Sequence, residues 1–192
     1  TGVGGHAAAP HETADTVPVM AAIVNALQTI VSRRIDPAMP CVVTIGTVNA
    51  GYRHNVIADR CKLTGTVRTY DKAVQDIVKR SIREMVEGIA SAMGAKASVS
   101  YKELYPALVN DAAVTDTMRQ LAAEMLGAEN VVKAAPTMGG EDFAFFLKKV
   151  PGTFMFIGSA NAGGQYSDMA HNPCFNLDER ALITMMKLYT AA

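Results

Sequence analysis

The clearest fold signal in this chain is the stretch RCKLTGTVRTYDKAVQDIVKRSIREMVEGIASAMG, residues 60–94. In its first ten residues, apolar side chains alternate with charged or hydroxyl-bearing ones, which predicts an antiparallel strand with one solvent-facing side. The rest predicts a helix from Asp71 to about Gly94, because apolar residues recur every three or four positions. The apolar positions are Cys61, Leu63 and Val67 in the strand, and Val74, Ile77, Val78, Ile82, Met85, Val86, Ile89 and Met93 in the helix.

Another helix and strand are predicted upstream of this stretch. Residues 41–50, CVVTIGTVNA, are rich in β-branched side chains and predict a strand. Before them, a helix is expected to begin at Asp15 or Thr16, since either residue can cap it and Pro18 suits a first turn. Its apolar stripe consists of Met20, Ile23, Val24, Leu27, Ile30 and Val31.

Two shorter stretches complete the first domain. Residues 2–7 are expected to form its first strand, and residues 97–105, which alternate in polarity, its last. The resulting order β-α-β-β-α-β is the ferredoxin-like, split βαβ arrangement, in which two helices cover one face of a four-stranded sheet. The fold class is therefore predicted to be α/β, beginning with an α+β domain.

A domain boundary is expected where Tyr105 and Pro106 interrupt this rhythm, which gives domains 1–104 and 105–192. The second domain has a different order of elements: a helix, a glycine-containing irregular stretch, a buried strand and a final helix. The signals are a helix at about 111–126 ended by Gly127, the apolar strand TFMFIG at 153–158, and a capping box of Asn176 and Glu179.

Composition excludes several classes of protein. With 49% hydrophobic and 19% charged residues, 192 residues can bury a sizeable core in one or two domains. Eighteen basic residues balance eighteen acidic ones, which argues against a nucleic-acid partner. Apolar runs stop short of the roughly 18 residues that cross a bilayer, so no membrane association is expected.

The cysteines bear on the cellular compartment, and the first residue bears on whether the chain is part of a longer protein. Cys41, Cys61 and Cys174 form no C-x-x-C pair and are odd in number, which indicates a reducing, cytoplasmic compartment. The first residue is Thr1, with no apolar signal segment after it, so the chain is expected to begin within a longer protein.

Four stretches carry candidate chemistry: GGHAAAPH at 4–11, HNVIAD at 54–59, MGGEDFAFF at 138–146 and AHNPCF at 170–175. Each is a weak signal alone. His6 is flanked by glycine, and such a histidine is more often a polar loop residue than a catalytic one.

Arg68 and Asn55 form a candidate carboxylate site. Arg68 lies on the polar face of the predicted strand, and Asn55 lies in the loop that leads into it. An arginine can bind a carboxylate through two parallel hydrogen bonds, and an asparagine amide can add a third donor. The alternative is a surface arginine and a turn asparagine.

The two later stretches suggest a ligand-binding loop and a metal ligand. Gly139 and Gly140 allow the backbone to approach a ligand, and Glu141 suits the N-terminus of a helix, although a plain loop fits as well. His171 precedes a rigid Asn-Pro turn and is a candidate metal ligand. One histidine does not make a zinc site.

Taken in order, GGHAAAPH, NVIAD followed by GTVRTYD, MGGEDFAFF with PGTFMFIG, and AHNPCF resemble the zinc metallopeptidase and aminoacylase family. Within it they resemble the hippurate hydrolase and N-acyl-amino-acid amidohydrolase branch, whose GGED form replaces the GGTD of its relatives. The resemblance covers almost the whole chain. It implies metal-dependent hydrolysis of the amide bond of hippurate-like or N-acetyl amino acids.

The resemblance also implies domain and residue roles. Residues 1–104 match a lid, or dimerisation, domain through which the protein forms a homodimer, and 105–192 match the end of a zinc-peptidase catalytic domain. His6 matches a histidine that crosses the dimer to stabilise an oxyanion. The substrate-binding positions are Asn55, Arg68, Gly139, Gly140 and Glu141, and His171 matches the last metal ligand.

Other parts of the family pattern are missing. The resemblance implies two divalent metal ions, zinc or alternatively manganese, held mostly by an upstream C-x-H motif, a glutamate-rich motif and another histidine, none of which this chain contains. The chain alone is therefore expected to be inactive. His54 differs from the small or apolar residue expected there, and its role and that of His11 are open. The competing hypothesis is a non-catalytic dimerisation or binding module, because fold alone does not decide function.

Overall fold

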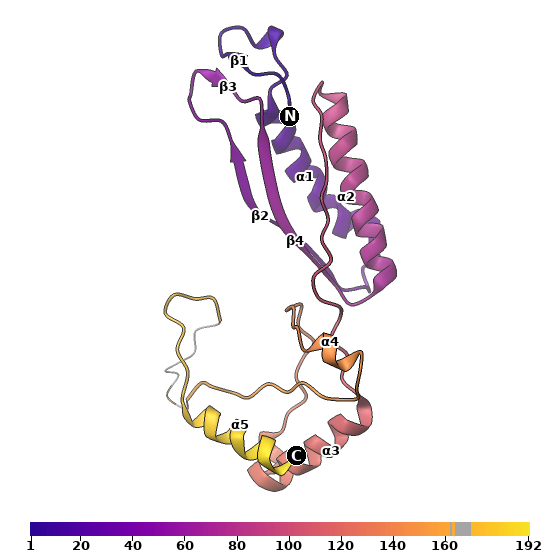
Figure 1. Cartoon of the computed structure of the whole chain (residues 1–192), viewed down its shortest axis with the longest axis vertical. Coiled ribbons are helices and arrows are strands. Elements are labelled where there is room, and N and C mark those ends of the chain that lie inside the picture. The colour runs from indigo at the N-terminus through magenta and orange to yellow at the C-terminus, as the bar shows by residue number, and fades with distance from the viewer. Residues whose placement is uncertain (162, 164–169) are drawn as a thin grey trace. The chain divides into compact units, whose positions relative to one another are not determined.

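The computed structural model describes residues 1–161, 163 and 170–192 (Figure 1). The chain divides into two compact units. Unit 1 comprises Thr1–Ala107 with Met138–Gly140, and unit 2 comprises Leu108–Thr137 with Glu141–Ala192. The change of unit after Ala107 lies close to the break predicted at Tyr105, and unit 1 also includes a short segment from the second half of the chain.

Both predicted helices of unit 1 form, and side chains cap them as expected. α1 (Thr16–Arg34) begins after Asp15, whose carboxylate accepts a hydrogen bond from the N–H of Val17 at 2.9 Å. α2 (Lys72–Ala92) begins after Asp71, whose carboxylate accepts from the N–H groups of the second and third helical residues. These caps satisfy N–H groups that have no partner inside a helix.

The strands of unit 1 form two separate antiparallel pairs. β2 (Cys41–Ala50) pairs with β4 (Cys61–Thr69) along its whole length, with a bulge between Ile45 and Thr47. β1 (Gly5–His6) pairs with β3 (Val56–Ile57). Figure 1 shows this short pair beyond one end of the β2–β4 ribbon.

The α/β class is confirmed, but the prediction of one four-stranded sheet is wrong for the described residues. The first strand shrinks to two residues and pairs with β3, outside the main ribbon. Residues 97–105 form no strand; instead Lys79 of α2 bonds Glu103 at 3.0 Å and lies over the ring of Tyr101. Alternating polarity predicts which side of a strand is buried but not whether a partner strand exists.

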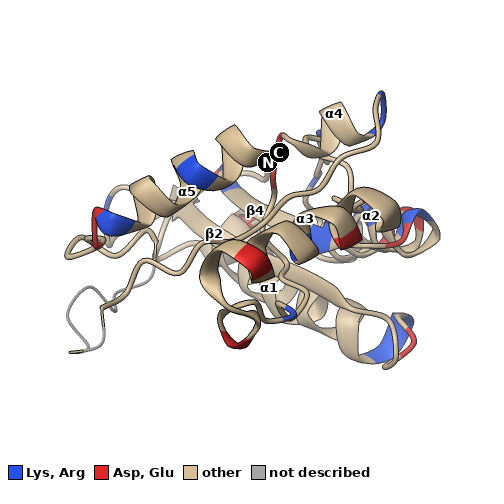
Figure 2. Cartoon of the chain, turned by 90° about the horizontal axis from the view of Figure 1, so that it is seen from below, with Lys and Arg blue, Asp and Glu red and all other residues tan. Residues whose placement is uncertain are grey.

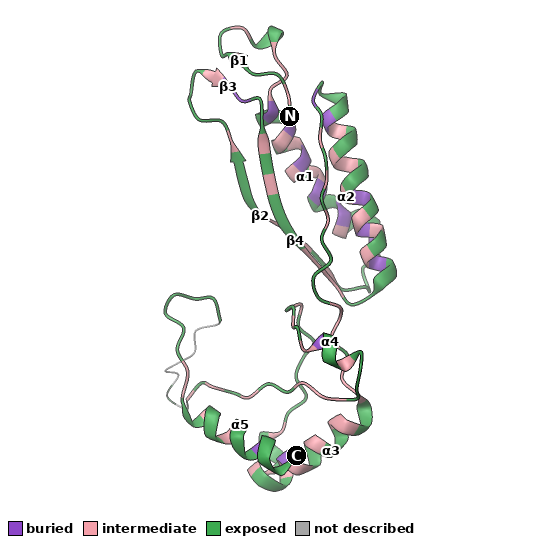
Figure 3. Cartoon of the chain, in the orientation of Figure 1, coloured by how far each residue is buried: buried purple, intermediate pink, exposed green. Residues whose placement is uncertain are grey.

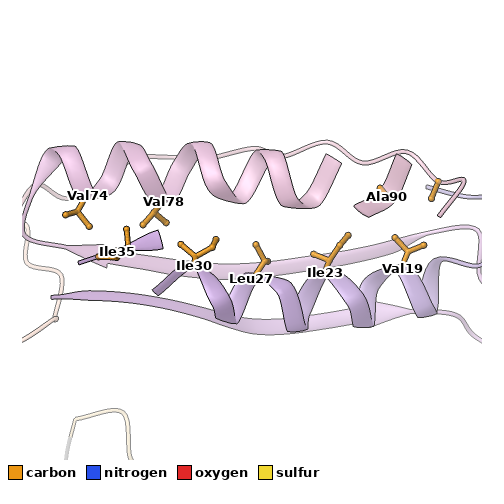
Figure 4. Packing of buried hydrophobic residues seen from close by; sticks show 9 residues of the cluster. Val19, Ile23, Leu27, Ile30, Ile35, Val74, Val78 and Ala90 are labelled. Carbon is orange, nitrogen blue, oxygen red and sulfur yellow. The ribbon is translucent and has the colours of Figure 1, made fainter. Parts of the chain in front are cut away.

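The core of unit 1 lies between its helices and the ribbon. Ile30 of α1 and Val78 of α2 have no exposed surface, and Figure 4 shows the labelled side chains lying between the two helices. Most buried residues of the two helices lie on the predicted stripes, but Val19 and Ala90 are buried outside them, and Met93 is exposed (Figure 3). The cluster comprises Val19, Ile23, Leu27, Ile30, Ile35, Val74, Val78, Ala90 and Ala95.

α1 is long and apolar enough to cross a membrane by length and composition, contrary to the expectation from the sequence. Core helices share these properties, and α1 contributes Val19, Ile23, Leu27 and Ile30 to the core of unit 1. The burial therefore indicates a core helix. Figure 2 shows that Lys, Arg, Asp and Glu residues are distributed along the helices, and several pair locally, such as Lys72 with Asp76.

Unit 2 contains three α-helices among its described residues: α3 (Ala112–Leu126), α4 (Ala144–Leu147) and α5 (Arg180–Ala191). α3 forms as predicted, capped by Asp111 at the N–H of Val114 over 3.0 Å and ended by Gly127 with a φ of 90°. Short 3-10 helices occupy Pro10–Glu12 in unit 1 and Ala128–Asn130 in unit 2.

Two predictions for unit 2 are wrong. Residues 153–158 form no strand; Asn110 instead holds them through two hydrogen bonds with the backbone of Phe154, at 2.8 and 3.0 Å. The capping box of Asn176 and Glu179 is absent, because the carboxylate of Asp178 accepts from the N–H of Arg180 and binds its guanidinium. The side chain that accepts a hydrogen bond at the start of α5 is that of Asp178, two positions after the predicted Asn176.

Candidate functional site

His6 is held by backbone pairing and leaves its ring exposed. It lies in β1 opposite Val56 of β3, and its Nδ1 accepts a hydrogen bond from the N–H of Ala8 at 3.0 Å. Because Nδ1 is the acceptor, the proton of the neutral ring lies on Nε2. His6 therefore presents an N–H donor, which is the group that an oxyanion needs.

Asn55 lies beside the His6 loop. The N–H of Ala7 donates to the carbonyl oxygen of Asn55 at 3.1 Å, and the N–H of Val56 donates to Arg53 at 3.3 Å, which closes a turn before β3. Asn55 and His54 are both exposed. The structure thus joins two predicted site residues that are 49 positions apart in the sequence.

An open hollow of about 690 Å³ lies next to this turn. His54, whose role the sequence alone left open, lies in the lining of this hollow. The lining includes Ala7, Pro10, Asp15, Tyr52, Arg53 and His54.

Arg68 lies at the opposite end of the ribbon. It sits near the end of β4, opposite Val42 of β2, and its Nη1 donates to the carbonyl oxygen of Val67 at 3.1 Å. The side chain is half-buried, on the face predicted from the alternation of the strand. Asn55 precedes the start of β4, and the seven steps from Cys61 to Arg68, at roughly 3.3 Å each, span about 23 Å.

Asn55 and Arg68 of one copy therefore do not reach the same carboxylate. Hydrogen bonds require donor and acceptor atoms within about 3 Å, whereas Asn55 precedes the Cys61 end of β4 and Arg68 lies near the other end of this strand. An extended strand carries its two ends apart, so closeness in the sequence does not give closeness in space. Their predicted use of one carboxylate stays a prediction that would require two copies of the chain.

Gly140 approaches Arg68. Gly140 belongs to unit 1, and a Cβ placed on it would lie 3.7 Å from Nε and 3.8 Å from Nη2 of Arg68. The prediction that these glycines let the backbone approach a ligand stays a prediction, because the neighbours of Gly140 are side chains of the same chain. Glu141 belongs to unit 2, where its carboxylate accepts from the N–H of Phe143 at 3.5 Å, and Phe143 directly precedes α4.

His171 occupies an exposed turn in unit 2 with a positive φ of 73°. Asn172 holds the turn, since its side chain accepts from the N–H of Cys174 at 2.8 Å and its carbonyl from Phe175 at 2.9 Å. In the part of the chain that the structure describes, no three His, Cys, Asp or Glu side chains are grouped to hold a metal ion. His171 is thus a single potential ligand.

Tyr105 makes a contact that the sequence did not predict. The sequence predicts it as the end of a strand and as part of a domain boundary, yet its Cδ2 would lie 3.1 Å from a Cβ on Gly140. Residues 68, 105 and 140 therefore meet within unit 1. The one signal in the sequence was the aromatic residue before Pro106, which marks a fixed loop but not its neighbours.

Comparison with known proteins identifies relatives. A sequence model of "Peptidase family M20/M25/M40" matches residues 2–192. N-acetyl-L-cysteine deacetylase of Bacillus subtilis is 38% identical over 182 residues, covering 95% of this chain and 42% of that protein. N-acetyldiaminopimelate deacetylase of Exiguobacterium sibiricum is 38% identical over 187 residues, covering 97% and 49%.

A solved structure agrees with these matches. The YXEP protein of Bacillus subtilis, a dinuclear metal binding peptidase from the M20 family, superposes with a TM-score of 0.67 at 34% identity, over 92% of this chain and 44% of that one. The chain therefore spans about half the length of the relatives that it matches.

Proposed function

Because this chain belongs to peptidase family M20/M25/M40, we propose that it supplies the lid domain and the C-terminal catalytic segment of a cytoplasmic, metal-dependent amidohydrolase. The observation that carries the proposal is the pairing of β1 with β3, which fixes His6 beside Asn55 with an imidazole N–H exposed. The proposed lid is residues 1–104, and the proposed catalytic segment is 105–192.

The proposed substrates are N-acyl amino acids, either N-acetyl or hippurate-like. Two relatives are named for removing an acetyl group from an amino acid, cysteine in one and diaminopimelate in the other. Such substrates carry a free carboxylate close to the amide that is cleaved. Arg68 offers a half-buried guanidinium for that carboxylate, and bidentate arginine contacts favour this geometry.

His6 is proposed to act on the amide carbonyl during hydrolysis. Attack of water on the amide carbon places negative charge on the carbonyl oxygen, and a donor already in position stabilises that charge. The Nε2 proton of His6 supplies such a donor, since Nδ1 is engaged with Ala8. Proposed supporting contacts to substrate come from Asn55, Gly139, Gly140 and Glu141.

A homodimer through the lid would bring the separated groups together. In the described residues, β2 pairs only with β4, so its other edge has unpaired backbone groups, and Val48 is 47% exposed. Antiparallel pairing of β2 with β2 of a second copy would set the His6 end of one ribbon beside the Arg68 end of the other. Two copies would then complete a site that one copy leaves divided.

The metal ions are proposed to be bound mainly by residues outside this chain. The proposed ions are two divalent metals, zinc or manganese, and a relative of known structure is dinuclear. The described residues contain no group of three potential ligands and so do not by themselves fit a metal pair. His171 is its proposed contribution to the complete site.

The test compares the 192-residue chain with the full-length protein from the same gene. Both are assayed for release of acetate and benzoate from N-acetyl amino acids and hippurate, with zinc or manganese added. The full-length protein should turn over substrate, and the shorter chain should neither turn over substrate nor retain metal after dialysis. A full-length protein without activity on any of these substrates would favour a non-catalytic dimerisation module.

A further inference from the structure

Three segments that are far apart in the sequence meet at the end of β4. A Cβ on Gly140 would lie 3.1 Å from Cδ2 of Tyr105 and 3.7 Å from Nε of Arg68, so the Gly140 backbone faces both the aromatic ring and the guanidinium. All three residues belong to unit 1. A side chain at residue 140 would crowd the ring of Tyr105 and would be in ordinary van der Waals contact with the guanidinium of Arg68.

The guanidinium has a defined orientation. Its Nη1 donates to the carbonyl oxygen of Val67 at 3.1 Å, whereas Nε and Nη2 lie on the side of Gly140. The Nε–Nη2 edge is one of the two edges through which arginine makes two parallel hydrogen bonds to a carboxylate. The backbone of Val67 and the segment of Gly140 therefore decide where that edge points.

We infer that Tyr105 is a positioning residue for Arg68: its ring supports the Gly140 backbone against the guanidinium and so aims the Nε–Nη2 edge at the substrate carboxylate. This inference rests on the proposed function of Arg68. Tyr105 is 50% exposed, so its ring contributes little to the core and shapes this corner locally. A well-placed guanidinium loses less side-chain entropy when it binds.

The inference predicts a change in substrate binding. In the full-length protein, Tyr105→Ala should raise KM for an N-acetyl amino acid roughly tenfold, the size of a coupling between neighbouring side chains, and leave kcat nearly unchanged. KM for the corresponding amino-acid amide, which lacks the carboxylate, should not change. Tyr105→Phe should behave like the parent protein, because it keeps the ring.

The matched control is Leu104→Ala. Leu104 is adjacent in the chain and similarly exposed, at 55%, and its removal should leave KM for both substrates unchanged. Circular dichroism of each variant checks that the fold is retained. A Tyr105→Phe variant as impaired as Tyr105→Ala would overturn the packing role, and so would an equal effect of Leu104→Ala.

A double-mutant cycle separates this inference from the proposed function. Added to Arg68→Ala, the Tyr105→Ala change should have no further effect on KM, since the group that it positions is gone. If Arg68→Ala alone does not change the preference for the carboxylate, the proposed function of Arg68 fails. If Arg68→Ala changes it and Tyr105→Ala does not, only the positioning role fails.

Discussion

The backbone N–H of Ala7 donates a hydrogen bond to the carbonyl oxygen of Asn55 at 3.1 Å. This bond extends the two-residue pairing of β1 with β3 and fastens the turn after His6 to the turn before Val56. Ala58, which follows β3, is held in turn by the start of α1. These hydrogen bonds connect the His6 and Asn55 turns to the core of unit 1, although the side chains of both residues are exposed.

Thr16→Val should destabilise unit 1. The buried hydroxyl of Thr16 donates to the carbonyl oxygen of Ala58 at 2.9 Å, and valine keeps the shape but removes the donor. We expect the free energy of unfolding to fall by about 1 kcal/mol, as for other buried hydrogen bonds. Urea unfolding followed by circular dichroism measures the change.

Thr29→Val is the matched control in the same helix. Its hydroxyl is exposed and donates to Ala26 at 2.7 Å, so water can satisfy the carbonyl after substitution. The expected change is within about 0.5 kcal/mol, as for most surface substitutions. Equal destabilisation by the two variants would show that the contact with Ala58 has no special weight.

Val48→Lys should weaken the proposed dimer. Val48 lies in β2, and a lysine at a free strand edge opposes pairing with another strand. Light scattering should give twice the mass of one chain for the parent and a concentration-dependent shift towards one chain for the variant. Thr117→Lys, at an exposed position of α3 in unit 2, adds the same charge and should not alter the mass. A parent that stays monomeric at high concentration contradicts the dimer.

Arg68→Ala in the full-length protein should mainly affect binding. Loss of the guanidinium leaves the substrate carboxylate without its charged partner, which we expect to raise KM by an amount equivalent to about 2–5 kcal/mol. Substrates with an amidated carboxylate should lose much less. Arg68→Lys keeps the charge but not the two-donor edge, so an intermediate KM is expected. Equal losses for both kinds of substrate would remove Arg68 from carboxylate binding.

The helices could be predicted because their signals are local. Asp15, Asp71 and Asp111 cap the starts of α1, α2 and α3, and apolar stripes of period 3.6 mark the buried faces. Local signals were not enough for segments 97–105 and 153–158, which have strand-like sequences but form no strand. A strand needs a partner strand, which its own sequence does not specify.

The candidate site was predicted as a set of residues but not as an arrangement. Alternation along β4 predicted that Arg68 lies on the face opposite Val67. The contact between the His6 and Asn55 turns depends on the β1–β3 pair, which no local pattern indicated. The approach of Tyr105 to Gly140 is a tertiary contact across 35 positions of the sequence. Periodicity contains no information on such contacts.

His6→Ala in the full-length protein should affect the transition state more than binding. His6 makes no core contact, so the fold should persist, and its proposed partner is a charge that develops only during reaction. We expect kcat to fall about 10²–10³-fold, the size of losing one oxyanion donor, with a modest change in KM. His11→Ala, at an exposed position five residues along the chain, is the control and should leave kcat unchanged. An increase in KM with normal kcat would assign His6 to substrate binding instead.

A mixing experiment then tests whether His6 acts across the dimer. Full-length His6→Ala protein should keep at most about one hundredth of the parent activity because it lacks the oxyanion donor, and His171→Ala protein should be inactive because it lacks a proposed metal ligand. After subunit exchange at equal amounts, half of the dimers are hybrids, and each hybrid holds one site with both residues intact. Activity should therefore recover to about a quarter of the parent value. Chains that carry both substitutions, mixed with His6→Ala chains, should stay inactive and serve as the control. If exchange is demonstrated by mass spectrometry and the first mixture also stays inactive, His6 does not act on the neighbouring subunit, and GGHAAAPH is better explained as a structural turn.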